Sequence, residues 1–570
     1  MKKGTYVVII ILVFVLLFAT TVVSFFYLNF SRPPTVKSDS YLEIGLNGAI
    51  QDFAVPDFLM SVLSGTRPLS LHDIWTNLRK AKTDDRIHAV LLRLGSLACD
   101  WAKVSEIREA VLDFRSSGKK VLAYVEEEPE FDKEYYLATA CDRIILHPMG
   151  WVGINGIGGY VPFFKKALDK LGIRAEFEYL EEYKTAYNEY TEDRFTGPHR
   201  EMIESIYKDI LSEYIKTVAR ARKKSEEEVR GLINRGFFYG EEALKAGVAD
   251  DLLYEDELQT ALAEKGRRIY KISLNEYSLA AAPAAGLSRG RKIALIYGQG
   301  TIIHGESFRE MMGSTAVSRW IRKAREDSSI AAIVFRVDSP GGSAVASDII
   351  GREVVLARKV KPVVISMSDM AGSGGYWIAM AGHKIVAQPQ TLTGSIGVIS
   401  GKFNLAGLYE KLGITAEKVT FGEKADIFSS FRGLKDDEKK LLREQNTWYY
   451  EQFMSRVAEN RNMTKERVHA IAKGRVWTGN QAKEIGLVDE IGGLSRAIEI
   501  AKKLAGIPQD EAVKLDVWPK RTSFLGSLFN RNAEKPGVRL PGHLDKVLSY
   551  YKIMEKERIW ALMPFWPAFQ

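Results

Sequence analysis

YYLATACDRIILHPMGWVGINGIGG (residues 135–159) returns without a gap as YWIAMAGHKIVAQPQTLTGSIGVIS (residues 376–400), at an offset of 241 residues. The similarity continues from KLGIRAE (170–176) to KLGITAE (411–417), and it resumes between GEEALKAGVADDL (240–252) and GNQAKEIGLVDEI (479–491). Self-similarity of this length indicates a duplicated structural unit. The sequence therefore predicts two tandem repeats, residues 41–275 and 291–517, joined by an Ala/Gly/Pro-rich linker at 276–290.

Each repeat alternates short apolar runs with helical patterns. The runs typical of buried strands are IHAVLLRL (87–94), KKVLAYV (119–125), KIALIYG (292–298), IAAIVFRV (330–337) and KPVVISM (361–367). Apolar residues at helical spacing fill residues 318–327 and 347–359, and longer charged helices are predicted at 199–224 and 436–461. Strands that alternate with helices predict an α/β fold with a mostly parallel sheet in each repeat.

The ends of the chain differ from the repeats. Residues 6–28 carry no charged side chain and are long enough to cross a bilayer, so residues 1–40 are predicted to be a membrane anchor, with a cleaved signal peptide as the alternative. Lys2 and Lys3 precede this span, which weakly favours a cytoplasmic N-terminus. Residues 518–570 form a C-terminal extension. Its apolar segment 544–554 suggests a packing strap or an oligomer contact, with membrane contact or substrate mimicry as alternatives.

Composition narrows the classes of function. The 570 residues are 46% hydrophobic and 27% charged, which excludes a disordered chain or a polytopic membrane protein. A net charge of +8 without a polybasic run gives no support for nucleic-acid binding. The two cysteines, Cys99 and Cys141, are expected to be buried free thiols rather than a disulfide. The sequence has neither a nucleotide-binding loop nor a Cys/His cluster of metal-ligand spacing, so no cofactor and no metal are expected.

Candidate catalytic residues appear where the repeats disagree. The second repeat has DSPGGS (338–343) after one strand, whereas the first has GSLACD from Gly95; Ser373 in AGSGG corresponds to Asp132. A serine at a strand-to-helix turn is well placed as a nucleophile, and the N–H groups of Gly374 and of Gly341 or Gly342 would form an oxyanion hole. The alternative is that Ser373 only caps a helix.

A serine nucleophile needs a base. None of the eight histidines has a recognisable triad spacing, and His383 would lie about 15 Å along the helix from Ser373. A buried lysine with a lowered pKa is the other option. Lys184 in FEYLEEYKTAYNEY (177–190) has Ala425 as its repeat partner, so one repeat keeps the lysine and the other keeps the serine. A solvated surface lysine is the alternative reading of Lys184.

Four motifs in order carry a resemblance: SPGGS (339–343), AGSGGYWIAMA (371–381), TLTGSIGV (391–398) and RVWTGNQAKEIGLVDEIGG (475–493). They resemble the serine–lysine peptidase family of signal peptide peptidase A, in its long tandem form, within the Clp/crotonase superfamily. The resemblance implies Clp/crotonase-like repeats of the ββα-superhelix type. It also implies that Ser373 is the nucleophile, Lys184 the general base and Ser395 the residue that orients this lysine. Ser395 is replaced by Ile154 in the first repeat.

The resemblance also implies where and on what the protein acts. Such peptidases digest remnant signal peptides and other short apolar peptides outside the cytoplasm, and they assemble as bowl-shaped rings. This predicts a homo-oligomer such as a tetramer, anchored by one span in a bacterial inner membrane with its catalytic part on the periplasmic side. A crotonase-like acyl-CoA enzyme and a non-catalytic membrane scaffold are the competing functions. Short relatives take their base from the vacant position beside Lys424, so Lys424 would substitute for Lys184 if this loop shifted its register by one residue.

Overall fold

The computed structural model describes residues 13, 14, 17, 34–55, 68–125, 131–263, 268–280, 286–308, 311–520 and 559–563. The predicted span at 6–28 lies almost wholly outside these residues, and the apolar segment 544–554 lies wholly outside them. Among the helices of the described ranges, none combines the length and the apolar character that a membrane crossing requires.

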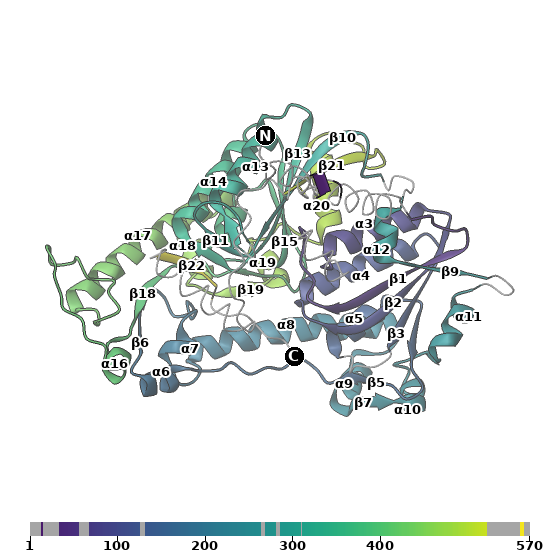
Figure 1. The fold of residues 1–570 in the computed structure, drawn as a ribbon, viewed down its shortest axis with the longest axis horizontal. Helices are drawn as coiled ribbons and strands as arrows, with labels where there is room; N and C mark the ends of the chain where they lie inside the picture. The colour runs from purple at the N-terminus through teal and green to yellow at the C-terminus, as the bar shows by residue number, and fades with distance from the viewer. Residues whose placement is uncertain are drawn as a thin grey trace, which may run out of the picture.

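Two parallel sheets with the same strand order form the two halves of the molecule (Figure 1). In the first half the order is β8-β4-β3-β2-β1-β9, and in the second half β20-β16-β15-β13-β10-β21, with parallel pairing throughout. The strands of the first sheet are β1 (Ser40–Gly48), β2 (Ile87–Leu97), β3 (Lys120–Val125), β4 (Arg143–Leu146), β8 (Asp251–Leu252) and β9 (Tyr270–Ser273). Those of the second are β10 (Arg291–Gln299), β13 (Ile330–Ser339), β15 (Val363–Gly372), β16 (Lys384–Ala387), β20 (Glu490–Ile491) and β21 (Val513–Trp518). The α/β fold and the repetition expected from the sequence are therefore present.

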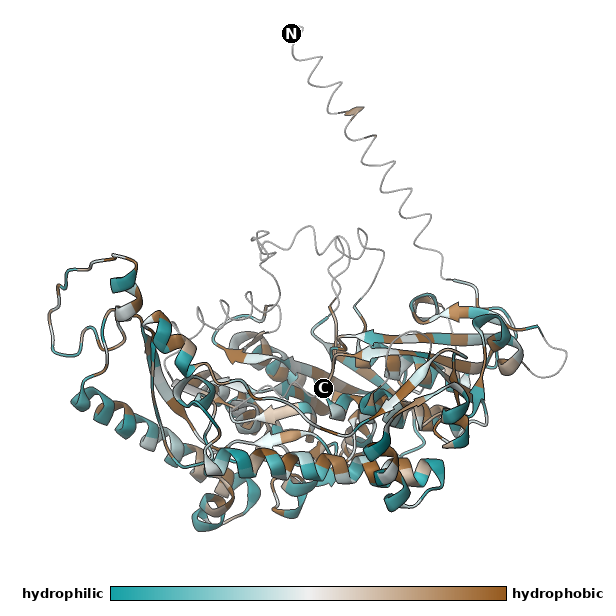
Figure 2. Ribbon diagram, turned by 90° about the horizontal axis from the view of Figure 1, so that it is seen from below, coloured by the Kyte–Doolittle hydropathy of each residue, from teal (hydrophilic) through white to brown (hydrophobic). Residues whose placement is uncertain are grey.

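Helices cover these sheets because their apolar residues recur three or four positions apart. The first half contains α3 (Leu71–Thr83), α4 (Trp101–Arg115), α5 (Asp132–Ala138), α6 (Lys165–Leu171), α7 (Asn188–Thr191), α8 (Gly197–Arg222), α9 (Glu226–Arg235), α10 (Gly240–Lys245), η1 (Glu255–Glu257), α11 (Leu258–Leu262) and α12 (Leu274–Leu279). The second contains α13 (Ser314–Glu326), α14 (Ala344–Arg358), α15 (Gly374–Ala379), α16 (Ala406–Lys411), α17 (Asp436–Arg461), α18 (Lys465–Ile471), α19 (Gly479–Glu484) and α20 (Leu494–Leu504). The outer helix α17 is mostly hydrophilic, and it buries Leu442, Tyr450, Phe453 and Val457 at helical spacing (Figure 2).

A smaller sheet ties the two halves together. β6 (Arg174–Tyr179) of the first half pairs antiparallel with β18 (Ile399–Asn404) of the second. The same sheet has the order β12-β11-β14-β22-β18-β6, where β11 is Thr301–Ile303, β12 Met311–Gly313, β14 Gly341–Ser343 and β22 Ile559–Leu562. β5 (Trp151–Ile154) pairs with β7 (Gly236–Tyr239), as β17 (Leu392–Gly394) pairs with β19 (Val476–Thr478). Helix α8 runs along the lower edge of Figure 1 from the first half to β19 of the second, where Asp209 accepts a hydrogen bond from Thr478 at 2.5 Å.

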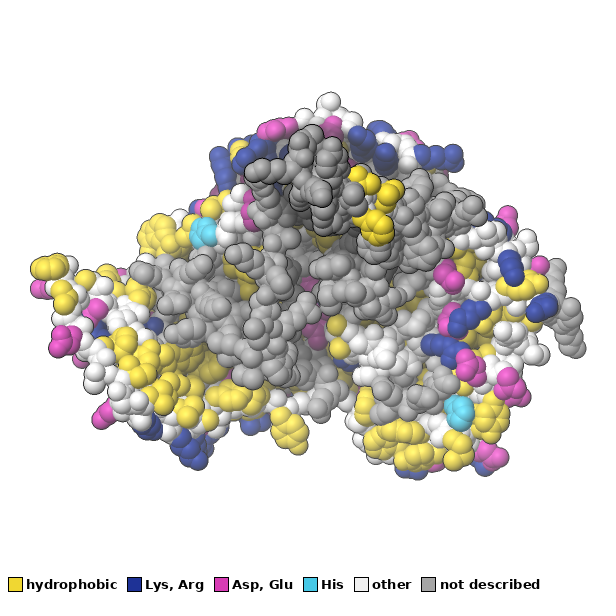
Figure 3. Space-filling view, in the orientation of Figure 1, with side chains coloured by type: hydrophobic (Ala, Val, Ile, Leu, Met, Phe, Trp, Pro, Cys, Tyr) yellow, Lys and Arg dark blue, Asp and Glu magenta, His cyan; other side chains and the backbone are white. Residues whose placement is uncertain are grey.

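Large apolar side chains remain exposed at both ends of the face shown in Figure 3. Next to α6 and α16, Leu171 and Leu412 are 52% and 64% exposed. Near β5 and β7, Met149 and Tyr239 are 85% and 56% exposed. Contiguous exposed apolar surface often marks a contact site.

Candidate active site

Ser373 occupies the sharp turn between β15 and α15. Its backbone lies at φ 53°, ψ −111°, a region that a residue other than glycine adopts only when the surroundings enforce it. The turn is enforced because Ser373 N donates to Gly394 O at 2.8 Å and because Gly372 pairs with Gly394 in β17. The side chain donates to Gly397 O at 3.2 Å and does not cap α15, so the simple capping interpretation is wrong.

Lys184 reaches Ser373 from the first half of the chain. Its Nζ lies 2.9 Å from Ser373 Oγ and 2.9 Å from Ser395 Oγ, and it donates to Ser395 O at 3.0 Å. All three side chains are fully buried, so Lys184 is not a solvated surface lysine. Burial lowers the pKa of Lys184 well below its usual value, because the ammonium form loses its hydration. At any pH below its usual pKa, a larger fraction of this lysine is therefore the neutral amine than of a lysine in water.

The backbone of both halves shapes the slot for this lysine. The antiparallel pairing of β6 with β18 brings the 180–187 loop to the second half, and Tyr183 N donates to Lys473 O at 3.1 Å. A Cβ placed on Gly474 would lie 2.5 Å from Lys184 Cβ, and one on Gly397 would lie 3.2 Å from Lys184 Cδ. A side chain at position 474 would therefore overlap Lys184, and one at position 397 would press against it.

The predicted oxyanion donors lie next to the serine. A Cβ on Gly341 would come within 2.8 Å of Gly374 N, and one on Gly374 would come within 3.1 Å of Gly342 N. Gly374 is the first residue of α15, where the N–H points out of the helix without an intrahelical acceptor. Gly341 N donates to Ser339 Oγ at 3.2 Å, so the geometry favours Gly342 as the second donor.

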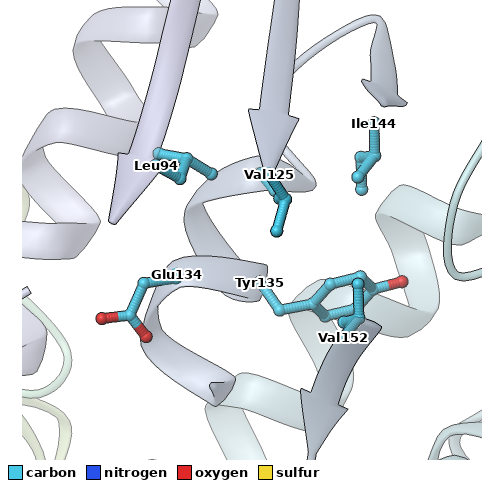
Figure 4. A pocket seen from close by; sticks show the side chains of 7 residues that line it. Leu94, Val125, Glu134, Tyr135, Ile144 and Val152 are labelled. Carbon is cyan, nitrogen blue, oxygen red and sulfur yellow. The ribbon is translucent and has the colours of Figure 1, made fainter. Parts of the chain in front are cut away.

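Helix α5 of the first half begins at Asp132, the repeat position of Ser373. A small cavity beside this helix is lined by apolar side chains of β2, β3, β4 and β5, together with Glu134, Tyr135 and Ala138 of α5 (Figure 4). Asp132, at the repeat position of Ser373, accepts hydrogen bonds from Asn155 N and Gly156 N at 3.1 and 2.9 Å. In the first half the residue at this position therefore holds the backbone of residues 155 and 156.

A buried ion cluster supports the glycine loop, and sequence reasoning missed it. Lys103 of α4 lies 2.6 Å from Asp338 and 2.8 Å from Asp369, so it joins the first half to the residue that opens DSPGGS. Burial alone would lower the pKa of Lys103, but attraction to the two carboxylates outweighs it and raises that pKa. Burial raises the pKa of Asp338 to about 6 against the attraction of Lys103. Asp338 is the first residue of the DSPGGS motif, whereas nothing in the sequence indicated that Lys103 is its partner.

A second buried cation lies close to this cluster. Arg336, 1% exposed, contacts Asp52 at 2.9 Å and Glu106 at 2.7 Å, and both carboxylates belong to the first half. Attraction to these carboxylates raises the pKa of Arg336 despite its burial. Paired charges of this kind fix the relative position of the halves, because an unpaired buried charge costs several kcal/mol.

The remaining candidates lie elsewhere. Lys424 forms an exposed ion pair with Asp437 on α17 and has no contact with Ser373. His383 follows α15, and its Nδ1 accepts a hydrogen bond from Val363 N at the opposite end of β15. Cys99 and Cys141 are free and buried, as expected. Within the described residues no cluster of three or more His, Cys, Asp or Glu side chains is arranged to hold a metal ion.

Comparison with known proteins matches this chain to one family. The model of peptidase family S49 covers residues 113–268 and 356–508, one segment in each half. The chain belongs to peptidase family S49. This S49 peptidase is 36% identical to "Serine protease SPPA, chloroplastic" of Arabidopsis thaliana, over 84% of this chain and 71% of the relative. It is 34% identical to "Protease 4" of Salmonella typhi, over 83% of this chain and 79% of the relative.

These relatives establish the S49 chain as a serine protease. A shorter relative, "Putative signal peptide peptidase SppA" of Enterococcus faecium, is 35% identical over 41% of this chain and 67% of its own length. Among solved structures, a mutant of ClpP1 from Listeria monocytogenes matches 36% of this chain and 94% of its own, at 16% identity and a TM-score of 0.24. The α/β assignment rests on the strand order of the S49 chain itself.

Proposed function

We propose that the S49 chain is a membrane-anchored serine endopeptidase with Ser373 as nucleophile and Lys184 as general base. The observation that carries this proposal is the buried contact of 2.9 Å between Lys184 Nζ and Ser373 Oγ. A neutral amine at this distance accepts the hydroxyl proton as the serine attacks the scissile carbonyl. The proton then passes to the leaving amine, and water hydrolyses the acyl-enzyme.

Three neighbouring groups have supporting roles in this proposal. Ser395 orients Lys184, because its hydroxyl and its carbonyl both accept hydrogen bonds from Nζ. The N–H of Gly374 and a second N–H from the Gly341/Gly342 loop stabilise the oxyanion. The geometry favours Gly342 as the second donor, because Gly341 N already donates to Ser339 Oγ. No cofactor is needed for this chemistry.

The proposed substrates are remnant signal peptides and other short apolar or unfolded peptides. Support comes from the motif resemblance and from the name of the Enterococcus relative. We further propose that residues 6–28 anchor the protein in a bacterial inner membrane and that the Clp/crotonase-like repeats lie on the periplasmic side. The uncharged sequence of this segment supports the anchor.

The proposal includes assembly into a ring of identical chains, such as a tetramer. The exposed apolar side chains near α6 and α16 and near β5 and β7 support this (Figure 3), because a second copy of the chain would cover them. Lys184 and Ser373 meet within one chain, so the ring is not needed to complete this pair. Sedimentation of the detergent-solubilised protein tests the ring, and an active monomer at micromolar concentration would contradict it.

Digestion of a peptide library tests the reaction and the substrate class together. Wild-type protein should cut Leu/Ala-rich peptides faster than charged Gly/Ser-rich peptides, and Ser373→Ala and Lys184→Ala should cut neither. A fluorophosphonate or β-lactone probe should label the wild-type protein but not Ser373→Ala. A non-catalytic scaffold would not be labelled at Ser373. Coenzyme A binding in a calorimeter would instead favour an acyl-CoA enzyme.

A further inference from the structure

The three residues before the proposed base each contact the second half of the chain. Glu181 Oε1 lies 3.1 Å from Nε2 of His469 on α18, and Glu182 Oε1 lies 3.2 Å from Lys473 Nζ. The side chains of these two pairs are 26% to 48% exposed. Pairs open to water in this way contribute at most about 1 kcal/mol each. Of the three side chains, that of Tyr183 is therefore the one best able to hold the loop in place.

Tyr183 packs against Arg475, the first residue of the motif RVWTGNQAKEIGLVDEIGG. The guanidinium carbon of Arg475 lies 4.8 Å from the centre of the Tyr183 ring and 4.5 Å from the centre of the Trp477 ring. Arg475 Nη1 donates to Glu201 Oε1 at 2.7 Å, and Tyr183 Oη donates to Glu201 Oε2 at 2.8 Å. The Arg475 side chain is 16% exposed. A partly desolvated guanidinium over aromatic rings is attracted by them more strongly than one in water.

The backbone of Arg475 holds the turn on the other side of the lysine. Its carbonyl accepts a hydrogen bond from Ser395 N at 2.7 Å, and the preceding Gly474 N donates to Ile396 O at 2.9 Å. Ser395 has a φ of 50°, a left-handed conformation that the surroundings must enforce. Its hydroxyl and its carbonyl both contact Lys184 Nζ. Arg475 thus holds the Ser395 turn through its backbone and the lysine loop through its side chain.

The position of this loop decides two properties of the base. It sets the 2.9 Å contact between Lys184 Nζ and Ser373 Oγ, and it sets how well the amine is shielded from water. Burial is the cause that lowers the pKa of Lys184, while the charged side chains around its loop, at positions 181, 182, 201, 469, 473 and 475, pair with one another. A shift of the loop that lets water reach Nζ would therefore lengthen the contact and raise the pKa towards its usual value.

We propose that Arg475 is a positioning residue of the S49 chain, which fixes the Lys184 loop of the first half against the Ser395 turn of the second. This inference rests on the proposed function, and it adds a residue of the last motif that the Ser373/Lys184 pair left without a role. Arg475 acts through Tyr183 and Ser395 and not on the reacting atoms. Its backbone hydrogen bond to Ser395 is kept in any side-chain variant, so such variants test the contact with Tyr183 alone.

Steady-state cleavage of an apolar peptide by Arg475→Met tests the positioning. Methionine keeps an apolar stem but removes the guanidinium from the two rings and from Glu201. We expect kcat to fall by about 10- to 100-fold with KM changed by less than about 3-fold, because a small misplacement of a reacting group slows the chemical step more than it weakens binding. An unchanged kcat would overturn the inference.

The pH profile separates positioning from a general loss of structure. In Arg475→Met the midpoint at which kcat rises with pH should move up by about half a unit or more, since the amine of Lys184 becomes better hydrated. A variant that only unfolds part of the protein would lower kcat at every pH and leave the midpoint where it is. A lower kcat with an unmoved midpoint would therefore contradict the proposed role.

Arg93→Met is the matched control. Arg93 of β2 also lies over a ring, with its guanidinium carbon 5.5 Å from the centre of Tyr124, and it donates to Glu43 Oε2 at 3.1 Å. Its side chain is 23% exposed, and its contacts lie within the first half. This variant should keep the wild-type midpoint and a kcat within about 2-fold of wild type, because no contact of the lysine loop is removed. A midpoint that shifts as far as in Arg475→Met would mean that the shift does not report on the Tyr183 contact.

A second variant covers the case in which Arg475→Met does not fold. Tyr183→Leu removes the same contact from the first half and should lower kcat and raise the midpoint to a similar extent. Where both single variants fold, the double variant should be no worse than the more affected single one, because the two side chains act as a unit. Independent, multiplying losses would overturn the inference and leave the proposed function standing. If wild type cuts no peptide, or Ser373→Ala cuts as fast as wild type, the proposed function fails and the positioning role fails with it.

Discussion

Replacement of Lys184 by methionine is the sharpest test of the proposed base. Methionine keeps the length and the apolar stem of the side chain but removes the contact of Nζ with Ser373 Oγ and its hydrogen bonds with Ser395. Loss of a positioned general base slows catalysis by about 10²- to 10⁴-fold, which corresponds to roughly 3 to 5 kcal/mol in the activation free energy. Because Lys184 is the proposed base and contacts Ser373, we expect kcat to fall by about 10³-fold.

The same substitution should stabilise the folded protein, with a defined dependence on pH. The folded pKa of Lys184 lies below its unfolded value of about 10.4, so between these values the unfolded chain binds a proton that the folded chain does not. Stability of the wild type therefore rises with pH across this window. Lys184→Met removes that slope, and its advantage over wild type shrinks as the pH approaches the unfolded pKa.

The assay is steady-state cleavage of an apolar peptide across pH, combined with urea unfolding at each pH. Wild-type activity should rise with pH as Lys184 loses its proton, with a midpoint below about 10.4. Lys424→Met is the matched control, since Lys424 pairs with Asp437 at the surface, and it should retain nearly full activity. An active Lys184→Met together with an inactive Lys424→Met would refute the assignment of the base.

Three further predictions concern the loops and the core. In a chain that ends at Arg558 and so lacks β22, Gly341→Ala should lower kcat by about 10²- to 10³-fold with a smaller change in KM. The φ of Gly341 is 105°, and the new Cβ would lie 2.8 Å from Gly374 N, a proposed oxyanion donor. Unchanged steady-state kinetics would contradict this prediction. Lys103→Met should destabilise the protein by about 3 to 5 kcal/mol in urea unfolding, since it removes the cation from the buried carboxylate of Asp369 and the part-buried carboxylate of Asp338. The control Lys82→Met, at a partly exposed ion pair, should cost less than about 1 kcal/mol. Cys99 and Cys141 should resist iodoacetamide at about pH 8 in the native protein and react in denaturant, as followed by mass spectrometry, because burial raises the pKa of both thiols; alkylation of the native protein would contradict their burial.

Local patterns predicted the elements of this fold well. All five apolar runs form central strands of the two sheets, and the charged pattern at 436–461 matches the bounds of α17. These features depend on hydrophobic periodicity within a single element, and this periodicity can be read directly from the sequence. The turn that carries Ser373 was also predictable, because glycines mark the sharp bend between a strand and a helix.

The candidate site was predictable in its residues but not in its surroundings. Comparison of the two repeats singled out Ser373 and Lys184, since each repeat lacks the residue that the other keeps. Their contact across 189 positions depends on the pairing of β6 with β18. Nothing local in the sequence encodes that pairing.

The sequence by itself determined the duplication, the α/β class, the S49 motifs and the residues that differ between the repeats. Only the tertiary structure decided that the lysine and the serine meet within one chain, that Lys103 and Arg336 hold the halves together, and that Ile559–Leu562 pairs with β14 and β18. The physical reason is that these contacts join residues far apart in the chain. Their strength comes from burial and from complementary backbone edges, which exist only after both halves have folded and packed.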